Sequence, residues 1–377
     1  MKRKIKKAIN EPKAIFPYFK TKFWSLPYWT SKGGYSFLPR RIAIAVNSIC
    51  NLRCVMCDIG EHREDLQFYK NIEDKKTLSF EMFKILIDEV RYFRPFIVIN
   101  LTEPLLHKDI LFFVRYLSKQ GLNYQITTNG YLLEKFATKF VEDKVPLIYV
   151  SIDGPPEVHN KVRGVADSFQ KAYNGIQKLI QTKKELNQKL PRTCVAYTIS
   201  NYNSHCLNET ASIFKELGVE TIIFGHLNFI TEEMAKAHND QFGHICKVSP
   251  SGISTLNPKS VNIKALTEQI RLLKKNYPKT FINFLPDIAT FHEINTYYKN
   301  PEKPVLRRKC TVPWRNAQIL ANGDVVPASR CFHVVMGNIY QNSFVKIWND
   351  TVIRNFRKEL KKIGTTPACS RCCGILG

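Results

Sequence analysis

The sequence predicts an α/β protein: a partial, TIM-like (β/α)6 barrel followed by a small C-terminal domain that contains cysteines. Between residues 41 and 230, short β-branched runs alternate with amphipathic helical segments, which is typical of repeated βα units. Polar residues follow the first four predicted strands, where parallel barrels assemble their sites. We therefore expect a basic arm at 1–40, the barrel at 41–230, a connector at 231–305 and the cysteine-containing domain at 306–377.

The strands of the barrel are the apolar runs between helical segments. A first helix should begin after Ser79 as N-cap, with Phe83, Leu86, Val90 and Phe93 on its buried face. Later helices should end at Gly121 and Gly218, because glycine readily adopts the left-handed conformation at a helix end. The six expected strands are 42–46, 96–100, 123–127, 147–152, 193–199 and 220–224.

The charge is strongly basic, with 56 Lys and Arg against 32 Asp and Glu, a net charge of +24. Residues 1–41 contain eleven Lys or Arg and one acid, Glu11, together with nine aromatic residues. This mixture suits the surface of an anionic membrane or a nucleic acid, although an ordinary arm that packs on the domain explains it equally well. The nine aromatic residues are Phe16, Tyr18, Phe19, Phe23, Trp24, Tyr28, Trp29, Tyr35 and Phe37.

Three features of the sequence predict the cellular location: the lack of a long apolar run, the interrupted start and the pattern of cysteines. No run of about 18 apolar residues occurs, so we expect no membrane span. Glu11 to Lys13 interrupts the apolar core that a signal peptide would need after the basic start. The eleven cysteines are odd in number and bunched, which favours metal ligation in a reducing compartment over a disulfide framework. We therefore expect a cytoplasmic protein, peripheral to the inner face of the membrane if the basic arm binds lipid.

Three cysteines, Cys50, Cys54 and Cys57, directly follow the first predicted strand. Three soft ligands suit a cubane iron–sulfur cluster, which leaves one iron open for another ligand. A structural zinc site would need a fourth Cys or His close by. Iron–sulfur, zinc and buried structural cysteines all remain open from the spacing alone.

The stretch Val46 to Asp58 resembles the C-x3-C-x-Φ-C motif of the radical S-adenosylmethionine (SAM) superfamily, with Met56 at the apolar position Φ. The resemblance extends over about residues 41–230. It implies a [4Fe-4S] cluster that binds SAM through its open iron and cleaves it to methionine and a 5′-deoxyadenosyl radical. It also implies an electron donor such as flavodoxin or ferredoxin.

The segments after later strands resemble the SAM-binding motifs of that family. Asn100 to Pro104 corresponds to its G-G-E-P motif, but both glycines are absent. Asn129-Gly130 could instead be a turn, Asp153 a helix cap and Arg163 part of a surface ion pair. The residues that the resemblance implies for cofactor binding are Met56, Thr102, Glu103, Asn129, Ser151, Asp153 and Arg163.

The C-terminal segment resembles the SPASM or shorter twitch extension of radical SAM enzymes. Cys310, Pro313-Trp314, a hairpin at Asn322-Gly323 and a final C-x2-C pair carry this resemblance. Such extensions bind one or two auxiliary [4Fe-4S] clusters. Ala328 stands where a cysteine usually follows the hairpin, and Cys331 comes three residues later.

The cysteines in this half of the chain are too few for two fully ligated auxiliary clusters. We expect one second [4Fe-4S] cluster held by Cys310, Cys331, Cys369 and Cys372, with Cys373 as the substitute for Cys331. Zinc is the alternative metal for this site. Cys246, in the connector, is interpreted as incidental.

The resemblance implies an oxidoreductase-type radical SAM enzyme that abstracts hydrogen from an unactivated carbon. The net reaction would be an oxidation, a cross-link or a rearrangement, and the basic arm favours a lipid, sugar or nucleotide-like substrate. A peptide maturase is an alternative, although residues 1–40 are too few for a winged-helix leader-binding domain. A non-catalytic zinc protein that binds nucleic acid through its basic arm is the alternative from another class.

Overall fold

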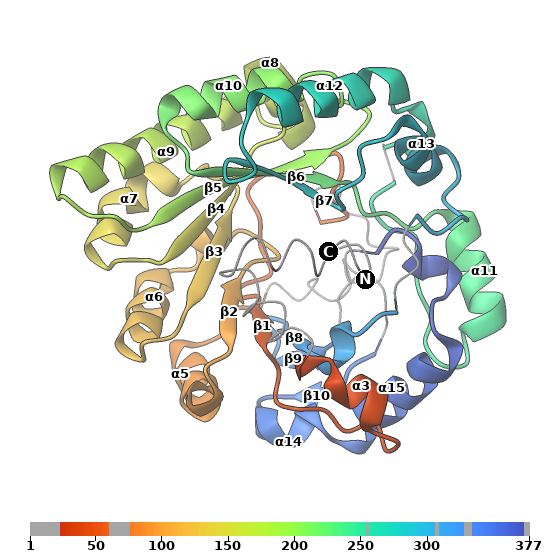
Figure 1. The fold of residues 1–377 in the computed structure, drawn as a ribbon. Helices are drawn as coiled ribbons and strands as arrows, with labels where there is room; N and C mark the ends of the chain where they lie inside the picture. The colour runs from red at the N-terminus through yellow and green to blue at the C-terminus, as the bar shows by residue number, and fades with distance from the viewer. Residues whose placement is uncertain (1–22, 60–75, 254–255, 306–308, 328–333, 373–377) are drawn as a thin grey trace.

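The computed structural model describes residues 23–59, 76–253, 256–305, 309–327 and 334–372. Within them, ten strands form one sheet in the order β10-β9-β8-β1-β2-β3-β4-β5-β6-β7. Figure 1 shows this sheet curving into an incomplete barrel, with helices α5, α6, α7, α9, α10 and α12 on its outer side.

Seven consecutive strands, β1 to β7, pair in parallel in chain order, so the predicted partial barrel is confirmed. The array exceeds the expected six strands because β7 pairs with β6. The interpretation of 231–305 as a connector without βα units is thereby corrected, since this segment supplies a barrel strand. The bounds are β1 Arg41–Ile44, β2 Phe96–Ile99, β3 Tyr124–Thr128, β4 Leu147–Ser151, β5 Arg192–Ile199, β6 Thr221–His226 and β7 Ile282–Leu285.

The helices of the barrel follow the predicted pattern closely. Ser79 caps α5 by accepting a hydrogen bond from the backbone of Met82, as expected for an N-cap. Phe93 lies beyond α5 in a short 3-10 helix, Arg91–Phe93, and is only partly buried. The helices are α5 Phe80–Val90, α6 Ile110–Lys119, α7 Leu133–Glu142, α8 Pro156–Arg163, α9 Ser168–Glu185, α10 Leu207–Leu217, α11 Glu232–Phe242, α12 Ile263–Asn276 and α13 Phe291–Lys299.

The C-terminal segment continues the same sheet. β8 (Asn316–Ile319) and β9 (Asp324–Val326) form the predicted hairpin around Gly323, and β10 (Gly337–Asn338) pairs with β9. β8 pairs in parallel with β1, from Arg41 opposite Asn316 to Ile44 opposite Ile319. The predicted boundary near residue 306 is therefore not a break in the sheet.

Helices complete the C-terminal segment on the side away from α9. α14 (Phe344–Trp348) and α15 (Thr351–Ile363) precede the short 3-10 helix η5 (Pro367–Cys369). The N-terminal helix α3 (Leu26–Thr30) lies beside α15 (Figure 1), and Lys361 of α15 donates a hydrogen bond to the carbonyl of Ser31. The first described residues thus pack on the last helix.

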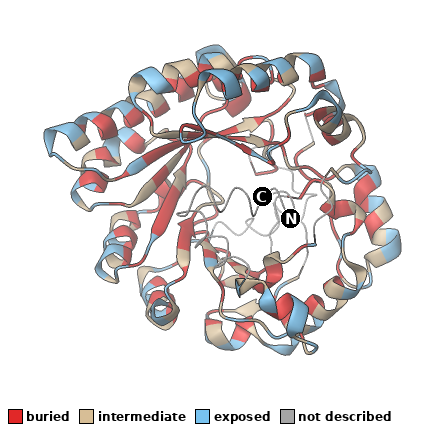
Figure 2. Cartoon of the chain, viewed as in Figure 1, coloured by how far each residue is buried: buried red, intermediate tan, exposed pale blue. Residues whose placement is uncertain are grey.

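The core lies between the sheet and its outer helices, where Figure 2 shows the buried residues. Strands β2 and β3 are buried almost throughout, as expected for parallel strands covered on both faces. No helix in the described part of the chain is long and apolar enough to span a membrane.

Candidate active site

The cysteine loop follows β1 and is fixed by backbone hydrogen bonds to the end of α8. The N–H of Arg53 donates to Arg163 O (3.1 Å) and the N–H of Val55 donates to Val162 O (3.0 Å). Gly164 makes this approach possible, because it has a φ of +71° and a Cβ there would collide with the carbonyl of Arg53. The loop conformation is therefore set by the fold around it.

A cavity of about 440 Å³ lies where this loop meets the carboxyl ends of the strands. Six of the seven residues expected to bind the cofactor line it, and Asp153 is not among the lining residues. The lining residues from the loop and the strand ends include Cys50, Cys54, Met56, Cys57, Asn100, Leu101, Thr102, Glu103, Thr128, Asn129, Ser151 and Arg163.

Two of the three sulfur atoms have nitrogen donors directed at them. Asn129 Nδ2 lies 3.8 Å from Cys50 Sγ, and Arg163 Nη1 lies 3.7 Å from Cys54 Sγ. Burial raises the pKa of the Cys54 thiol to about 12, and the positive charge of Arg163 opposes this rise. Such donors suit sulfurs that carry negative charge, as the thiolate ligands of a metal cluster do.

Arg163 forms a buried ion pair with Asp153, which lies behind it. Asp153 also accepts a hydrogen bond from the backbone N–H of Thr198 (2.7 Å) at the end of β5. Burial raises the pKa of Asp153, while Arg163 acts in the opposite direction. Asp153 thus holds Arg163 in place from the protein side and does not face the cavity.

Glu103 and Thr102 hold the loops after β1, β2 and β3 together. The buried Glu103 carboxylate accepts hydrogen bonds from Thr128 Oγ1 (2.7 Å), Asn129 N (2.6 Å) and Leu105 N (3.0 Å). Burial raises the pKa of Glu103 to about 7, against the effect of these hydrogen bonds. The Thr102 hydroxyl donates a hydrogen bond to the backbone carbonyl oxygen of Asn47 (2.7 Å).

The segment after β2 contains two features that sequence reasoning missed. Leu101 has a φ of +91°, a conformation that favours glycine, and its side chain packs with Ile59 and Cys57. Asn100 Oδ1 is buried without a hydrogen-bond partner among the described residues, and Asn100 lines the cavity. An unpartnered buried acceptor fits a ligand with an amino group. The signal in the sequence was that these residues replace the expected glycines.

Asp58 connects the cysteine loop to the segment expected to be a connector. Its buried carboxylate accepts hydrogen bonds from Ser251 Oγ (2.6 Å) and Gly252 N (2.9 Å). Because Asp58 follows Cys57 directly, residues 251 and 252 help to fix the end of the loop. No motif in the sequence indicated this contact.

The C-terminal cysteines Cys310, Cys369 and Cys372 are all buried. Cys331 and its substitute Cys373 lie outside the described residues, as does Ala328. Thr366 Oγ1 lies 3.2 Å from Cys369 Sγ and 2.9 Å from Nδ1 of His238 in α11. A hydroxyl directed at the Cys369 sulfur suits a thiolate that ligates an iron–sulfur cluster.

Cys246, interpreted from the sequence as incidental, lies near Cys369. His238 Nε2 lies 2.9 Å from Cys246 O and 3.9 Å from Cys246 Sγ. Burial and, to a lesser extent, the nearby Cys369 raise the pKa of Cys246 to about 12. Sequence spacing could not indicate this neighbour, because more than a hundred residues separate Cys246 from Cys369.

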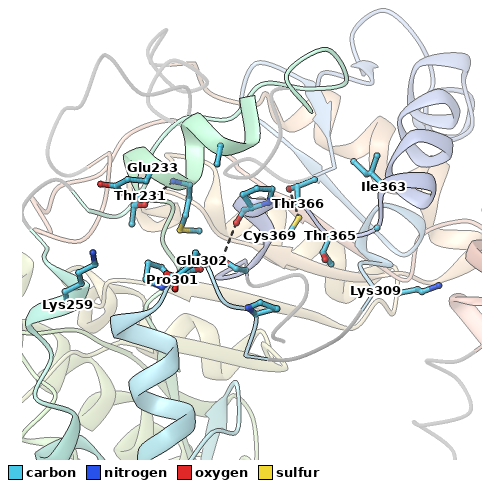
Figure 3. A pocket seen from close by; sticks show the side chains of 16 residues that line it. Thr231, Glu233, Lys259, Pro301, Glu302, Lys309, Ile363, Thr365, Thr366 and Cys369 are labelled. Carbon is cyan, nitrogen blue, oxygen red and sulfur yellow. Dashed lines mark hydrogen bonds between the residues drawn. The ribbon is translucent and has the colours of Figure 1, made fainter. Parts of the chain in front are cut away.

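A larger cavity of about 910 Å³ lies beside Cys369 (Figure 3). Residues from α11, from the segment after α13 and from the segment after α15 line it, together with Lys259 and Lys309. The figure shows Thr366 and Cys369 facing the cavity from one side and Glu233 and Thr231 bordering another. Within the described chain, its lining residues are distinct from those of the 440 Å³ cavity.

Two family models match the chain. The radical SAM superfamily model matches residues 44–185, and the SPASM model, an iron–sulfur cluster-binding domain, matches residues 310–373. These matches contain the two groups of cysteines described above.

Curated relatives and a solved structure agree with these matches. Fe-coproporphyrin III synthase of Methanosarcina barkeri is 29% identical over 180 residues, which is 47% of this chain and 41% of that protein. AdoMet-dependent heme synthase of the same organism is 25% identical over 350 residues, which is 89% of this chain and 90% of that protein. The chain therefore spans less than half of the first relative. The crystal structure of Streptococcus suis SuiB bound to S-adenosylmethionine has a TM-score of 0.60 at 13% identity, covering 85% of this chain and 68% of that one.

Proposed function

Since this chain belongs to the radical SAM superfamily and carries a C-terminal SPASM domain, we propose that it abstracts hydrogen from an unactivated carbon of a small-molecule substrate. Its cofactors are a [4Fe-4S] cluster, SAM and iron–sulfur in the SPASM domain. When bound, the first cluster and SAM supply a 5′-deoxyadenosyl radical. The observation that supports the proposal most strongly is the cavity in which three cysteines meet the strand ends, with nitrogen donors directed at two sulfurs.

The chain's own residues would bind and orient these groups. Cys50, Cys54 and Cys57 would hold the first cluster, and Asn129 and Arg163 would donate to its cysteine sulfurs. Hydrogen bonds to the sulfurs of a cluster raise its reduction potential, because they stabilise the more negative state. The two donors therefore favour reduction of the cluster.

SAM would be bound by the remaining lining residues. Asn100 Oδ1 would accept a hydrogen bond from the amino group of SAM, because it is a buried acceptor without a partner in the described chain. Met56 and Ser151 would contact SAM from the loop and from the end of β4. Glu103, Thr102 and Asp153 would act as positioning residues, because their polar atoms are hydrogen-bonded to the protein.

The substrate is proposed to be a small molecule of the lipid, sugar or nucleotide-like kind. The names of two relatives, a coproporphyrin synthase and a heme synthase, support a small molecule. The net charge of +24 favours an anionic substrate and an acidic electron donor such as flavodoxin or ferredoxin, in the cytoplasm. The net reaction would be an oxidation, a cross-link or a rearrangement. An oxidation would make the enzyme an oxidoreductase.

The second cluster is proposed to use Cys310, Cys369 and Cys372, with Cys331 as the fourth ligand. Cys246 is an alternative fourth ligand, because it is buried beside Cys369. The iron content of variants that lack one cysteine can decide between Cys331 and Cys246.

The first experiment is anaerobic reconstitution of the full chain, with iron, sulfide and zinc quantified. Dithionite and SAM are then added, and 5′-deoxyadenosine is measured. We expect about eight irons per chain, since each cubane holds about four. Replacing Cys50, Cys54 and Cys57 with Ala should leave about four irons and abolish SAM cleavage.

Single replacements then assign the second site, with Cys194→Ala as the control because this buried cysteine lies in β5. Loss of iron in Cys331→Ala but not in Cys246→Ala would support Cys331 as the fourth ligand. Loss of iron in Cys246→Ala but not in Cys331→Ala would assign Cys246 as the fourth ligand instead. A protein with tight zinc, no iron and no SAM cleavage would contradict the enzyme and favour a binding protein. Modification of a precursor peptide in place of a small molecule would favour a maturase.

A further inference from the structure

We propose that the surface formed by Phe23, Leu26, Trp29, Tyr35 and Phe37, called here the aromatic surface, binds the headgroup region of an anionic lipid membrane. The inference goes beyond the proposed function and does not depend on it. It follows from the exposure of these side chains and from the cations around them.

The segment has one packed side and one exposed side. Tyr28 is 2% exposed and packs edge-to-face on Trp314, with ring centroids 4.8 Å apart. In contrast, Trp29 is 59% exposed and Phe23 is 53% exposed. Leu26 and Trp29 are three residues apart in α3, so they share one side of this helix. Five large apolar side chains exposed in fifteen residues are more than the scattered few that a protein surface normally shows.

The two ends of the segment are brought together by ring stacking. The rings of Phe23 and Phe37 lie 5.0 Å apart with an interplanar angle of 17°. Trp348 Nε1 donates to the carbonyl of Phe37 (2.7 Å), which anchors this end on α14. The aromatic surface is therefore held on the folded domain in a fixed arrangement.

Cations surround the aromatic surface. Lys309 Nζ lies 4.8 Å from the centre of the Trp29 ring, and Arg354 Cζ lies 3.8 Å from that of Tyr35. Lys361 Nζ lies 3.2 Å from Ser31 O. Within the described part of the chain, no carboxylate forms an ion pair with Lys309, Arg354 or Lys361. Their charge is therefore available to an anionic partner.

An anionic membrane fits this combination better than a nucleic acid does. Aromatic rings interleaved with Lys and Arg are typical of segments that lie at the lipid headgroup level. Base stacking would need free ring faces, but one face of Phe23 is covered by Phe37, one of Trp29 by Lys309 and one of Tyr35 by Arg354. The net charge of +10 on residues 1–41 adds attraction to anionic lipid.

The test is co-sedimentation of the full chain with phosphatidylcholine vesicles, with and without phosphatidylglycerol. We expect binding to the anionic vesicles, weakening as salt increases. Combining Phe23→Ala, Leu26→Ala and Trp29→Ala should weaken binding at least about tenfold, because the apolar area that these side chains would bury in the lipid interface is lost. Lys361→Gln should weaken it about fivefold.

The control combines Tyr92→Ala, Phe112→Ala and Phe291→Ala, whose side chains are 65%, 54% and 55% exposed on other parts of the chain. It should bind as the unaltered chain does. Equal binding to neutral vesicles, no vesicle binding, or equal weakening by the control variant would each overturn the proposal. The proposal would also be overturned if the variant with alanine at 23, 26 and 29 bound vesicles normally and vesicle binding was lost only when residues 1–22 were removed. Binding of a single-stranded oligonucleotide in place of vesicles would assign the surface to nucleic acid.

Discussion

The two cysteine sites of this protein are built in different ways. The first takes three cysteines from eight consecutive residues, 50–57, in a loop pinned to α8 by two backbone hydrogen bonds. The second is expected to use Cys310, Cys369 and Cys372, and Cys246, which lies near Cys369, comes from the segment after α11. A local motif supplies the first site, whereas the second would have to be assembled from residues far apart in the chain.

The surroundings of the sulfurs differ as well. In the first site, an amide and a guanidinium are directed at Cys50 and Cys54, and the guanidinium is itself fixed by a buried carboxylate. In the second, a threonine hydroxyl approaches Cys369 and a neutral histidine lies behind it, since burial lowers the pKa of His238. The first site therefore depends on a buried charge, and single changes around it should have larger effects.

The largest expected effect comes from breaking the buried ion pair of the first site. Arg163→Met leaves the Asp153 carboxylate buried without its cation, which should lower the free energy of unfolding by about 3–5 kcal/mol. Combining Arg163→Met with Asp153→Leu should restore at least half of this loss, because no unpaired charge remains. Urea unfolding of the three chains at pH 7 measures both values. Equal stability of the single and double variants would show that the buried charge is not the cause.

A smaller effect should separate the two sites by backbone geometry. Gly164→Ala combines a left-handed backbone (φ +71°) with a collision at Arg53, which should cost about 3 kcal/mol and reduce iron in the first site. Gly218 is the matched control away from both sites, because its backbone is also left-handed (φ +94°, ψ 25°) and a Cβ placed there would come no nearer than 4.0 Å to another described atom. Gly218→Ala should cost about 1 kcal/mol and leave iron in both sites unchanged. Thermal unfolding and iron content measure the pair, and similar losses in both variants would argue against the collision.

The smallest effect concerns the barrel core that both sites share. Burial lowers the pKa of His226 to about 3, and its Nδ1 lies 2.9 Å from the Tyr298 hydroxyl. The unfolded chain binds this proton below about pH 6.5 and the folded chain does not, so stability falls with falling pH in that window. Between pH 7 and pH 5 the loss should be about 2 kcal/mol. Unfolding of His226→Phe at both pH values is the check, and an unchanged pH dependence would assign it to other groups.

Sequence patterns predicted the elements whose signals are local. Strands β1 to β6, the cap at Ser79 and the helix ends at Gly121 and Gly218 follow from apolar runs and from single residues. β7 was missed because it includes the polar Asn283 and has two exposed positions. The start of helix α10 at Leu207 has no strong sequence signal, because Cys206 stands at the N-cap position and makes no capping hydrogen bond with its side chain.

The candidate site was predictable where a motif supplied it. The cysteine loop and six lining residues were found from spacing and resemblance, although resemblance did not indicate that Asp153 lies behind Arg163. The contacts of Asp58 and Cys246 were missed because they join segments far apart in the chain. Asn100 was missed although it belongs to the segment that lacks the expected glycines. Pairing of β8 with β1 was missed for the same reason, since no local pattern specifies it.

That pairing has a consequence for how the chain can be divided. β1 is an inner strand of the sheet only because β8, contributed nearly three hundred residues later, covers its second side. A protein shortened to residues 1–305 would expose the backbone N–H and C=O groups of Arg41–Ile44 as an open sheet edge, which is a template for pairing with other chains. The C-terminal segment therefore also protects the barrel from aggregation, whatever metal it binds.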